Sequence, residues 1–327
     1  MLCLGIESTA HTFSCAVIEK NGKSGKILSD VRKIYRPPEG EGIHPREASR
    51  HHAEFSPQVL AECLQKADLQ VTDLDIISYA AGPGLGPCLR IGAVVARSLA
   101  SYYKIPIYPV NHALGHIELG KMLTGSKDPL VLLVSGGHTM ILAFLGGKWR
   151  VFGETLDITL GQLLDQIGRF AGFASPCGSR IEDLASKSSQ YEPLPYVVKG
   201  NDVSFSGLLS ATKRIIPKGI ETACFSLQET AFSMVGEAVE RALSFTGKKE
   251  FLVVGGVAAN KRLSEILHSI CKRHKCKFFV SPKEYAGDCG SQISWVGLLE
   301  SSKKSGSKIE ETFVKQSWRL DTVDVYY

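Results

Sequence analysis

Residues 130–145 read LVLLVSGGHTMILAFL, two apolar runs joined by a turn of small and hydroxyl-bearing residues. Each run has the length of a buried strand, so the stretch predicts a β-hairpin that ends at Gly146-Gly147. Residues 1–18 follow the same plan, with the turn ESTAHT between residues 1–6 and 13–18. The two similar stretches indicate an internal duplication in which each half of the chain begins with a hairpin.

Outside the hairpins, strand-like runs alternate with helix-like segments, which predicts an α/β fold. The expected strands are residues 74–81, 105–110 and 251–254, and the expected helices are residues 45–66, 91–103, 112–123 and a segment from residue 262. We place the first lobe at residues 1–126 and the second at residues 127–300. A C-terminal segment, residues 301–327, is expected to return to the first lobe.

Composition narrows the class of protein. The 327 residues are 44% hydrophobic and 22% charged, as in ordinary globular proteins, and the net charge of +5 permits an anionic partner without requiring one. No apolar run approaches the roughly 20 residues of a membrane span, and the N-terminus lacks the basic segment of a signal peptide. The nine cysteines include no C-x-x-C pair, which favours a reducing compartment. We therefore expect a cytoplasmic enzyme without a membrane partner.

Glycines at the ends of predicted strands indicate phosphate binding. A glycine after a strand lets backbone N–H groups converge on a phosphate, and a following helix N-terminus adds its dipole. The chain has 32 glycines but neither a Walker A motif nor a suitably placed G-x-G-x-x-G. The turns therefore predict a nucleotide clamped between two lobes, and they argue against a P-loop or dehydrogenase fold.

His112 and His116 are four residues apart in a predicted helix, so both imidazoles project from one face and can chelate a divalent metal. Ala113 stands where zinc proteases of the H-E-x-x-H type carry their glutamate base. The residues alone leave three candidates for a further ligand, namely His138, Glu118 and Asp288. For Asp288, which is flanked by glycines near a predicted helix, helix capping is the favoured interpretation.

Several carboxylates precede predicted helices in the second half of the chain. Glu154 and Asp157 lie in the segment GETLDITLG, Asp165 follows in the next helix, and Glu182 comes after PCGSRI. Such carboxylates either bind ribose hydroxyls or compensate the charge of helix N-termini. The pattern does not separate these two interpretations.

Taken together, the motifs resemble one family over essentially the whole chain. They are RSLA at 97–100 followed by IPIYPVNHALGHI at 105–117, HPREA at 44–48, VSGG at 134–137, GETLD at 153–157, SFSGL at 204–208 and GGVAAN at 255–260. The resemblance is to the tRNA N6-adenosine threonylcarbamoyltransferases, the TsaD/Kae family, in the form of the catalytic subunit of the archaeal and eukaryotic KEOPS complex.

This resemblance implies an actin/Hsp70/sugar-kinase (ASKHA) fold, with two ribonuclease-H-like lobes and a nucleotide cleft between them. It implies transfer of the threonylcarbamoyl group from threonylcarbamoyl-AMP to N6 of the adenosine 3′ of the anticodon in tRNA. It also implies one divalent metal, with iron favoured over zinc, and an adenine nucleotide in the cleft. The implied partners are tRNA, a small kinase/ATPase and a dimerising subunit.

Position by position, the resemblance implies that the metal ligands are His112, His116 and Asp288, which replaces the capping interpretation. The substrate or nucleotide site would consist of Leu133, Val134, Ser135, Gly136, Gly137, Asp165, Gly178, Glu182, Gly255, Gly256 and Asn260. Support for phosphate binding or catalysis is expected from Glu7, Ser8, Thr9, His11 and Glu154.

Two positions depart from the family pattern. Leu133 stands where a tyrosine is usual, which leaves three protein ligands, and Cys289 replaces a common asparagine beside Asp288. Three other functions compete with the transferase. They are a metalloprotease, a carbohydrate kinase or chaperone-like ATPase of the same fold, and a scaffold without catalysis.

Overall fold

The first strand of each predicted hairpin is the central strand of a five-stranded sheet in the computed structural model, which describes residues 1–327. One sheet has the strand order β3-β2-β1-β4-β5 and the other has the order β12-β11-β6-β7-β8. In each, an antiparallel meander of three strands continues into two parallel strands. The matching order confirms the predicted duplication at the level of topology.

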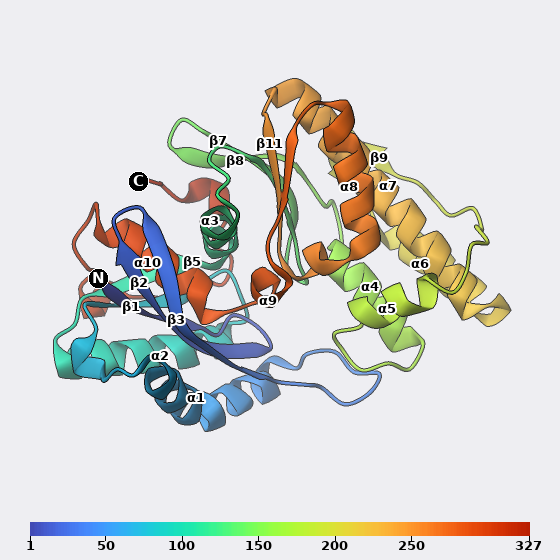
Figure 1. Cartoon of the computed structure of the whole chain (residues 1–327). Helices are drawn as coiled ribbons and strands as arrows, with labels where there is room; N and C mark the ends of the chain where they lie inside the picture. Colours follow the sequence, from blue (N-terminus) through green and yellow to red (C-terminus); the bar gives the residue numbers. More distant parts are fainter. The chain divides into compact units, whose positions relative to one another are not determined.

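The first unit comprises residues 1–36, 43–123 and 288–327. Its helices α1 and α2 lie on one face of the sheet and α10 lies on the other (Figure 1). Apolar side chains of β1, β2 and β4 form its core with α1 and α2. The elements are β1 Leu2–Glu7, β2 Thr12–Asn21, β3 Ser24–Ile34, α1 Pro45–Ala67, β4 Ile76–Gly82, α2 Gly86–Tyr103, β5 Ile107–Asn111, α3 His112–Thr124 and α10 Gly290–Ser301.

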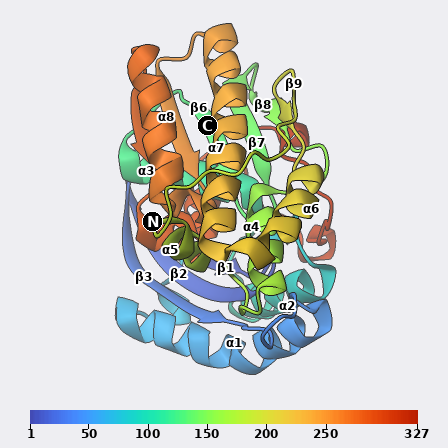
Figure 2. The ribbon, with the colours of Figure 1, turned by 90° about the vertical axis from the view of Figure 1, so that its right-hand side faces the viewer.

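The second unit comprises residues 37–42 and 124–287 and has a separate core. Its long helix α7 runs beside α8, as Figure 2 shows, and contributes the largest share of helical core residues. The elements are β6 Leu130–Val134, β7 Thr139–Leu145, β8 Lys148–Glu154, α4 Leu160–Phe170, α5 Gly178–Ala185, β9 Val198–Lys199, β10 Asp202–Val203, α6 Ser206–Ile215, α7 Ile220–Thr246, β11 Glu250–Val254, α8 Lys261–Arg273, β12 Lys277–Val280 and α9 Lys283–Ala286.

The division between the units differs from the expected boundaries at 126 and 301. The first unit ends at Leu123, and the chain returns to it at Asp288, because α10 packs on the sheet of the first unit. The Gly290 N–H donates to Ser14 Oγ at 2.9 Å, which ties the start of α10 to β2. Residues 37–42 belong to the second unit, where the carbonyl of Glu41 accepts from Ser175 Oγ.

The remaining expected elements are present with shifted ends. Helix α2 begins at Gly86, earlier than the predicted residue 91, since Pro87 is tolerated in the first helical turn where backbone N–H groups have no partner within the helix. None of the helices combines the length and the apolar character that a membrane-spanning segment requires.

Candidate metal centre and glycine loops

The two histidines of the predicted pair lie one helical turn apart at the start of α3. Asn111 Oδ1 accepts the Leu114 N–H, so this side chain caps α3 and places His112 at its first position. The imidazole rings of His112 and His116 have centroids 4.7 Å apart. Both side chains are buried in the first unit, as the i, i+4 spacing predicts for one helix face.

Asp288 completes a cluster with these histidines. Its Oδ1 lies 3.6 Å from His112 Nε2 and 3.3 Å from His116 Nε2, and the three ligand atoms lie within 4.8 Å of one another. The capping interpretation of Asp288 is wrong, because the N-cap of α10 is Cys289 and no side chain caps that helix. Among the other candidate ligands, Glu118 forms an ion pair with Lys121 at 2.9 Å.

The donor set of this cluster fits a divalent transition metal. His116 Nε2 is buried yet makes no hydrogen bond of good geometry, although Asp288 is close. Two imidazole nitrogens and one carboxylate oxygen are ligands that zinc and iron accept, and three protein ligands leave coordination positions open. Cys289 is not part of the cluster: its buried thiol donates to Gln292 Oε1, and burial raises its pKa well above the usual value.

The charged groups of the cluster shift one another's pKa values. Burial by itself lowers the pKa of His112, but the carboxylates of Glu7 and Asp288 outweigh it and raise that pKa to about 9. Burial lowers the pKa of His116, and Asp288 offsets this only in part. The two histidines outweigh the burial of Asp288 and hold the pKa of its carboxyl far below the usual range. Asp288 is therefore ionised, and the cluster can receive a cation.

Glu7 and Gln292 surround the other ring nitrogen of His112. Glu7 Oε2 lies 2.8 Å from His112 Nδ1, and Gln292 Nε2 donates to the same oxygen at 3.1 Å. Glu7 Oε1 accepts the Thr9 N–H at 2.6 Å. The motifs did not indicate Gln292, which lies in the first turn of α10, and no local pattern of the sequence points to its contact with Glu7.

The remaining residues of the first hairpin turn differ in exposure. Ser8 and Thr9 are buried with Glu7, so their side chains are closed to solvent, and His11 is half-buried. Ser8 Oγ has no hydrogen-bond partner and lies in the space that a Cβ on Gly92 of α2 would fill. In this turn, Ala10 and His11 are the residues that remain partly exposed.

The glycine turns of the second unit gather where β6 and β11 end. Ser135 Oγ accepts the N–H groups of Gly137 and His138, which shapes the turn after β6. Gly255 has a φ of +96°, and a Cβ there would lie 2.3 Å from the Val134 carbonyl oxygen, so only glycine fits. Because β6 and β11 are parallel neighbours, their carboxyl ends meet at one edge of the sheet.

Three of the glycines in the predicted nucleotide site have open space beside them. A Cβ on Gly136, Gly178 or Gly256 would have no neighbouring atom within 4 Å. Leu133 and Val134, by contrast, are wholly buried in β6, and Leu133 offers no ligand atom. The open glycines are therefore the part of the predicted nucleotide site that a ligand can approach.

The predicted polar side chains of the second unit hold its loops together. Asp165 accepts from Ser175 Oγ at 2.6 Å and from the Cys177 N–H at 2.9 Å. Glu182 Oε1 accepts the Lys261 N–H at 2.8 Å. These contacts join α4 to the loop before α5, and α5 to the start of α8. The side chains of Asp165 and Glu182 therefore fix the positions of these segments.

Two further residues of the predicted site, Asn260 and Glu154, also form hydrogen bonds within this unit. Asn260 caps α8 through the Leu263 N–H, and its Nδ2 donates to Gln228 Oε1 at 2.7 Å. Glu154 ends β8, and its N–H donates to Asp202 Oδ1 at 2.9 Å.

For Asp157, the structure decides between ribose binding and helix compensation. Its carboxylate accepts from Ser204 Oγ, from the Phe205 N–H, and from both the N–H and Oγ of Ser206, at the start of α6. Burial opposes ionisation, but these hydrogen bonds outweigh it and hold the pKa of Asp157 well below its usual range. The helix-compensation interpretation is correct for this residue.

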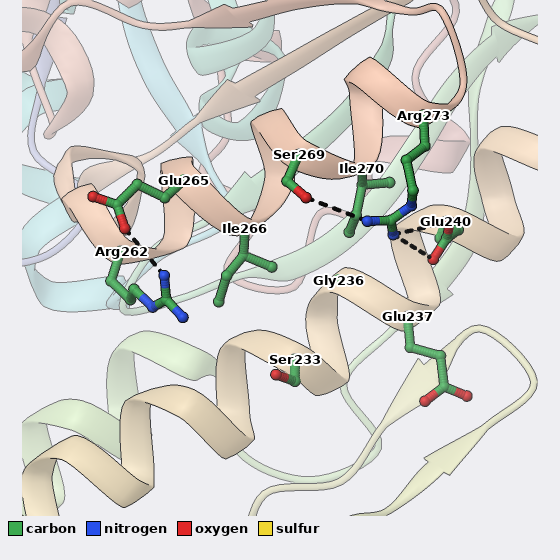
Figure 3. A pocket seen from close by; sticks show the side chains of 10 residues that line it. All are labelled: Ser233, Gly236, Glu237, Glu240, Arg262, Glu265, Ile266, Ser269, Ile270 and Arg273. Atoms are coloured by element: carbon green, nitrogen blue, oxygen red, sulfur yellow. Dashed lines mark hydrogen bonds and ion pairs between the residues drawn. The ribbon is translucent and has the colours of Figure 1, made fainter. Parts of the chain in front are cut away.

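A groove of about 350 Å³ lies between α7 and α8 (Figure 3). Its charged side chains are already paired: Arg273 with Glu240 at 3.1 Å, and Arg262 with Glu265 at 3.1 Å. Glu237 accepts from Tyr196 at 2.6 Å. Because these charges neutralise one another, the groove offers no group that specifies a ligand.

The fold places this chain in a known structural class. The two units have the same strand order, and the arrangement is that of the actin/Hsp70/sugar-kinase class of α/β proteins. HypF of T. kodakarensis superposes with a TM-score of 0.63 at 15% identity, over 92% of this chain and 48% of the HypF chain. The activator of the 2-hydroxyisocaproyl-CoA dehydratase of Clostridium difficile, with bound ADPNP, gives 0.54 at 12% identity, over 94% of this chain and all of that one.

Sequence comparison supplies the family within that class. The profile of TsaD, described as tRNA N6-adenosine threonylcarbamoyltransferase, matches residues 26–295. The transferase of that name from Caldivirga maquilingensis is 45% identical over 99% of this chain and 98% of its own length. A probable bifunctional tRNA threonylcarbamoyladenosine biosynthesis protein from Methanothermobacter thermautotrophicus is 47% identical, and this chain covers 60% of it. The chain belongs to the TsaD family of transferases.

Proposed function

We propose that this chain transfers the threonylcarbamoyl group of threonylcarbamoyl-AMP to N6 of the adenosine 3′ of the anticodon in tRNA. The observation that carries the proposal is the cluster of two buried histidines, His112 and His116, with the partly buried Asp288 in a chain of this family. An actin-type fold by itself also suits a kinase, whereas a buried metal-binding cluster is not needed for phosphoryl transfer from ATP.

The proposed reaction joins N6 of adenosine to the carbamoyl carbon and breaks the bond between that carbon and the phosphate oxygen. AMP leaves with the electron pair, and the amine loses one proton. The adenine amine is a poor nucleophile because its lone pair is delocalised into the ring. The reaction is therefore accelerated by the good leaving group of the mixed anhydride and by the positioning of both reactants.

His112, His116 and Asp288 would hold one divalent metal, and we favour iron. When bound, such an ion supplies Lewis-acid polarisation of an acyl or phosphate oxygen. The protein's own contribution is to hold two buried imidazoles and one partly buried carboxylate side by side, where an ion would replace the proton that His112 otherwise carries.

The glycine loops of the second unit would bind the adenylate. Gly136 and Gly256 leave open space after the carboxyl ends of β6 and β11, and Gly178 does so at the start of α5; their backbone N–H groups can approach a phosphate closely. In this proposal, Asp165, Glu182 and Asn260 keep the loops in place through the contacts described above.

The chain would act with partner proteins of the KEOPS type, a small kinase/ATPase and a dimerising subunit. The bifunctional name of the Methanothermobacter relative, which extends beyond the part that this chain covers, supports a second component. The net charge of +5 is small for a protein that grips tRNA alone, so partners would supply part of the tRNA-binding surface.

The test is a transfer assay with transcribed tRNA, threonylcarbamoyl-AMP made in situ from threonine, bicarbonate and ATP, and the partner subunits. Threonylcarbamoyladenosine is measured by mass spectrometry of tRNA nucleosides. His116→Ala is expected to lose activity, whereas His268→Ala, which changes an exposed histidine of α8, should keep it. Full transfer by His116→Ala would refute the proposed role of the cluster.

Metal identity needs a separate measurement. Protein purified without oxygen and without added metal should contain about one iron per chain by elemental analysis. A stoichiometric content of zinc instead would refute the choice of iron while leaving the transferase proposal intact.

A further inference from the structure

The carboxylate of Glu7 is wholly buried at the end of β1, and both of its oxygens have hydrogen-bond partners. Oε1 accepts the Thr9 N–H at 2.6 Å, and Oε2 accepts from Gln292 Nε2 at 3.1 Å and lies 2.8 Å from His112 Nδ1. An ionised carboxylate without partners would be costly to bury, so these hydrogen bonds are what make its position stable. None of its acceptor positions faces solvent, which leaves no place for a phosphate.

The contact with Glu7 decides which nitrogen of His112 is available. A carboxylate only accepts, so His112 Nδ1 carries a proton and donates it to Oε2. The opposite nitrogen, Nε2, faces Asp288 at 3.6 Å, on the side where His116 Nε2 also lies. Metal-ligating histidines generally need their second ring nitrogen fixed in this way by a carboxylate or carbonyl.

We propose that Glu7 is a positioning residue of the metal centre: it holds His112 in the Nδ1–H form and orientation that present Nε2 to a divalent cation between His116 and Asp288. The inference rests on the proposed metal-dependent function, and it assigns Glu7 a role different from the phosphate support expected from its place in the first hairpin turn.

Gln292 fixes the orientation of Glu7 in turn. The Cys289 thiol donates to Gln292 Oε1, so the amide nitrogen of Gln292 is directed to Glu7 Oε2 at 3.1 Å, where it also lies 3.0 Å from His112 Nδ1. Gly115 of α3 allows this close approach, since a Cβ there would lie 3.0 Å from Gln292 Cγ. The chain of contacts from Cys289 through Gln292 and Glu7 to His112 therefore depends on α10 lying against both β1 and α3.

The direct test is Glu7→Gln, which keeps the shape and removes the charge. An amide oxygen can still accept the Thr9 N–H, but the amide NH₂ then faces His112 Nδ1 and Gln292 Nε2, and it would favour the wrong imidazole tautomer. Isothermal titration of the metal-free protein with Zn²⁺ should show a 10- to 100-fold weaker affinity than the wild type. No tRNA is present, so the result is independent of transferase activity.

The matched control is Glu300→Gln. Glu300 is also a buried carboxylate of the first unit, but it lies at the far end of α10, paired with Lys304 at 2.7 Å. It is about 15 Å along the helix from Gly290, at 1.5 Å per residue. This variant is expected to bind Zn²⁺ as the wild type does, even if it unfolds at a lower temperature.

A double-mutant cycle separates positioning from general structural support. If Glu7 acts through His112, Glu7→Gln should weaken Zn²⁺ binding in the wild type but not further in His112→Ala. Equal fold-losses in both backgrounds, or binding by Glu7→Gln within two-fold of the wild type, would overturn the proposal. Should Glu7→Gln fail to fold, Gln292→Met replaces it in the cycle, and it too should lose affinity only when His112 is present.

Discussion

Gly5 sets the distance between β1 and α10, and Gly5→Ala is therefore expected to damage both stability and metal binding. A Cβ at this position would lie 2.3 Å from the Gly290 carbonyl oxygen and 2.3 Å from the Ser294 N–H nitrogen. Ordinary contact for such atoms begins at 3.4 Å, so α10 would have to retreat by 3.4 − 2.3 = 1.1 Å. Both obstacles are backbone atoms, which cannot turn aside as a flexible side chain can.

The retreat would break the contacts that anchor α10. The Gly290 N–H donates to Ser14 Oγ at 2.9 Å, and Ser294 Oγ donates to the Cys3 carbonyl at 2.8 Å. Overpacking of a core costs about 1–3 kcal/mol, and we expect about 3 kcal/mol here because a whole helix must move. At roughly 2–4 °C per kcal/mol, the unfolding midpoint should fall by about 6–12 °C. Asp288 lies two residues before Gly290, so the affinity for a divalent metal should fall as well.

The measurement is thermal unfolding of the metal-free protein by circular dichroism, followed by titration with Zn²⁺. Gly207→Ala is the control, because a Cβ on Gly207 would meet no atom within 4 Å and alanine favours the helix α6 by about 0.5–1 kcal/mol. If Gly5→Ala unfolded within 1 °C of the wild type and bound Zn²⁺ equally well, the close packing of α10 on β1 would not be the constraint described here.

Three further predictions concern metal, pH and helix capping. At a metal concentration about 1,000 times Kd, calorimetry should show that the metal raises the free energy of unfolding of the wild type by about 4 kcal/mol. The metal should not raise that of His116→Ala. Burial lowers the pKa of His52 to about 4. In the unfolded chain, His52 binds a proton near pH 6.5, whereas in the folded chain it stays neutral down to about pH 4. The free energy of unfolding should therefore fall by about 3 kcal/mol as the pH drops from 6.5 to 4. Urea unfolding at several pH values should show that His52→Gln lacks this component. Asn260→Ala removes the cap of α8 and leaves Gln228 Oε1 without its amide donor, so urea unfolding should report a loss of about 1–3 kcal/mol.

Local sequence patterns predicted most of the regular elements. The apolar runs at 130–134 and 251–254 are buried strands, and the His112/His116 spacing does place both imidazoles together. These features depend on side-chain periodicity and on short turns, which are encoded within a few residues. The motif resemblance likewise predicted the family correctly, because its motifs occur in order along the whole chain.

The predictions that failed concern contacts between distant segments. The neighbours of Asp288 alone predict a helix cap, and the expected boundary at 301 places residues 288–300 in the second lobe, whereas the structure has them in the first unit. Both depend on where α10 packs, and that packing is allowed by Gly5 of β1 and Gly290 of α10, whose backbones touch. A glycine in a strand signals a close approach, but it does not say which segment approaches.

The sequence by itself determined the duplicated hairpins, the histidine pair and the family. The resemblance already implied that Asp288 belongs with His112 and His116, and the structure places the three ligand atoms together. Only the tertiary structure decided that Glu7 lies against His112 rather than in an open phosphate turn. The physical reason is that a buried carboxylate has the role set by the donors around it. The donors of Glu7 come from its own turn, from α3 and from α10, segments that are brought together only when the sheet of the first unit is covered.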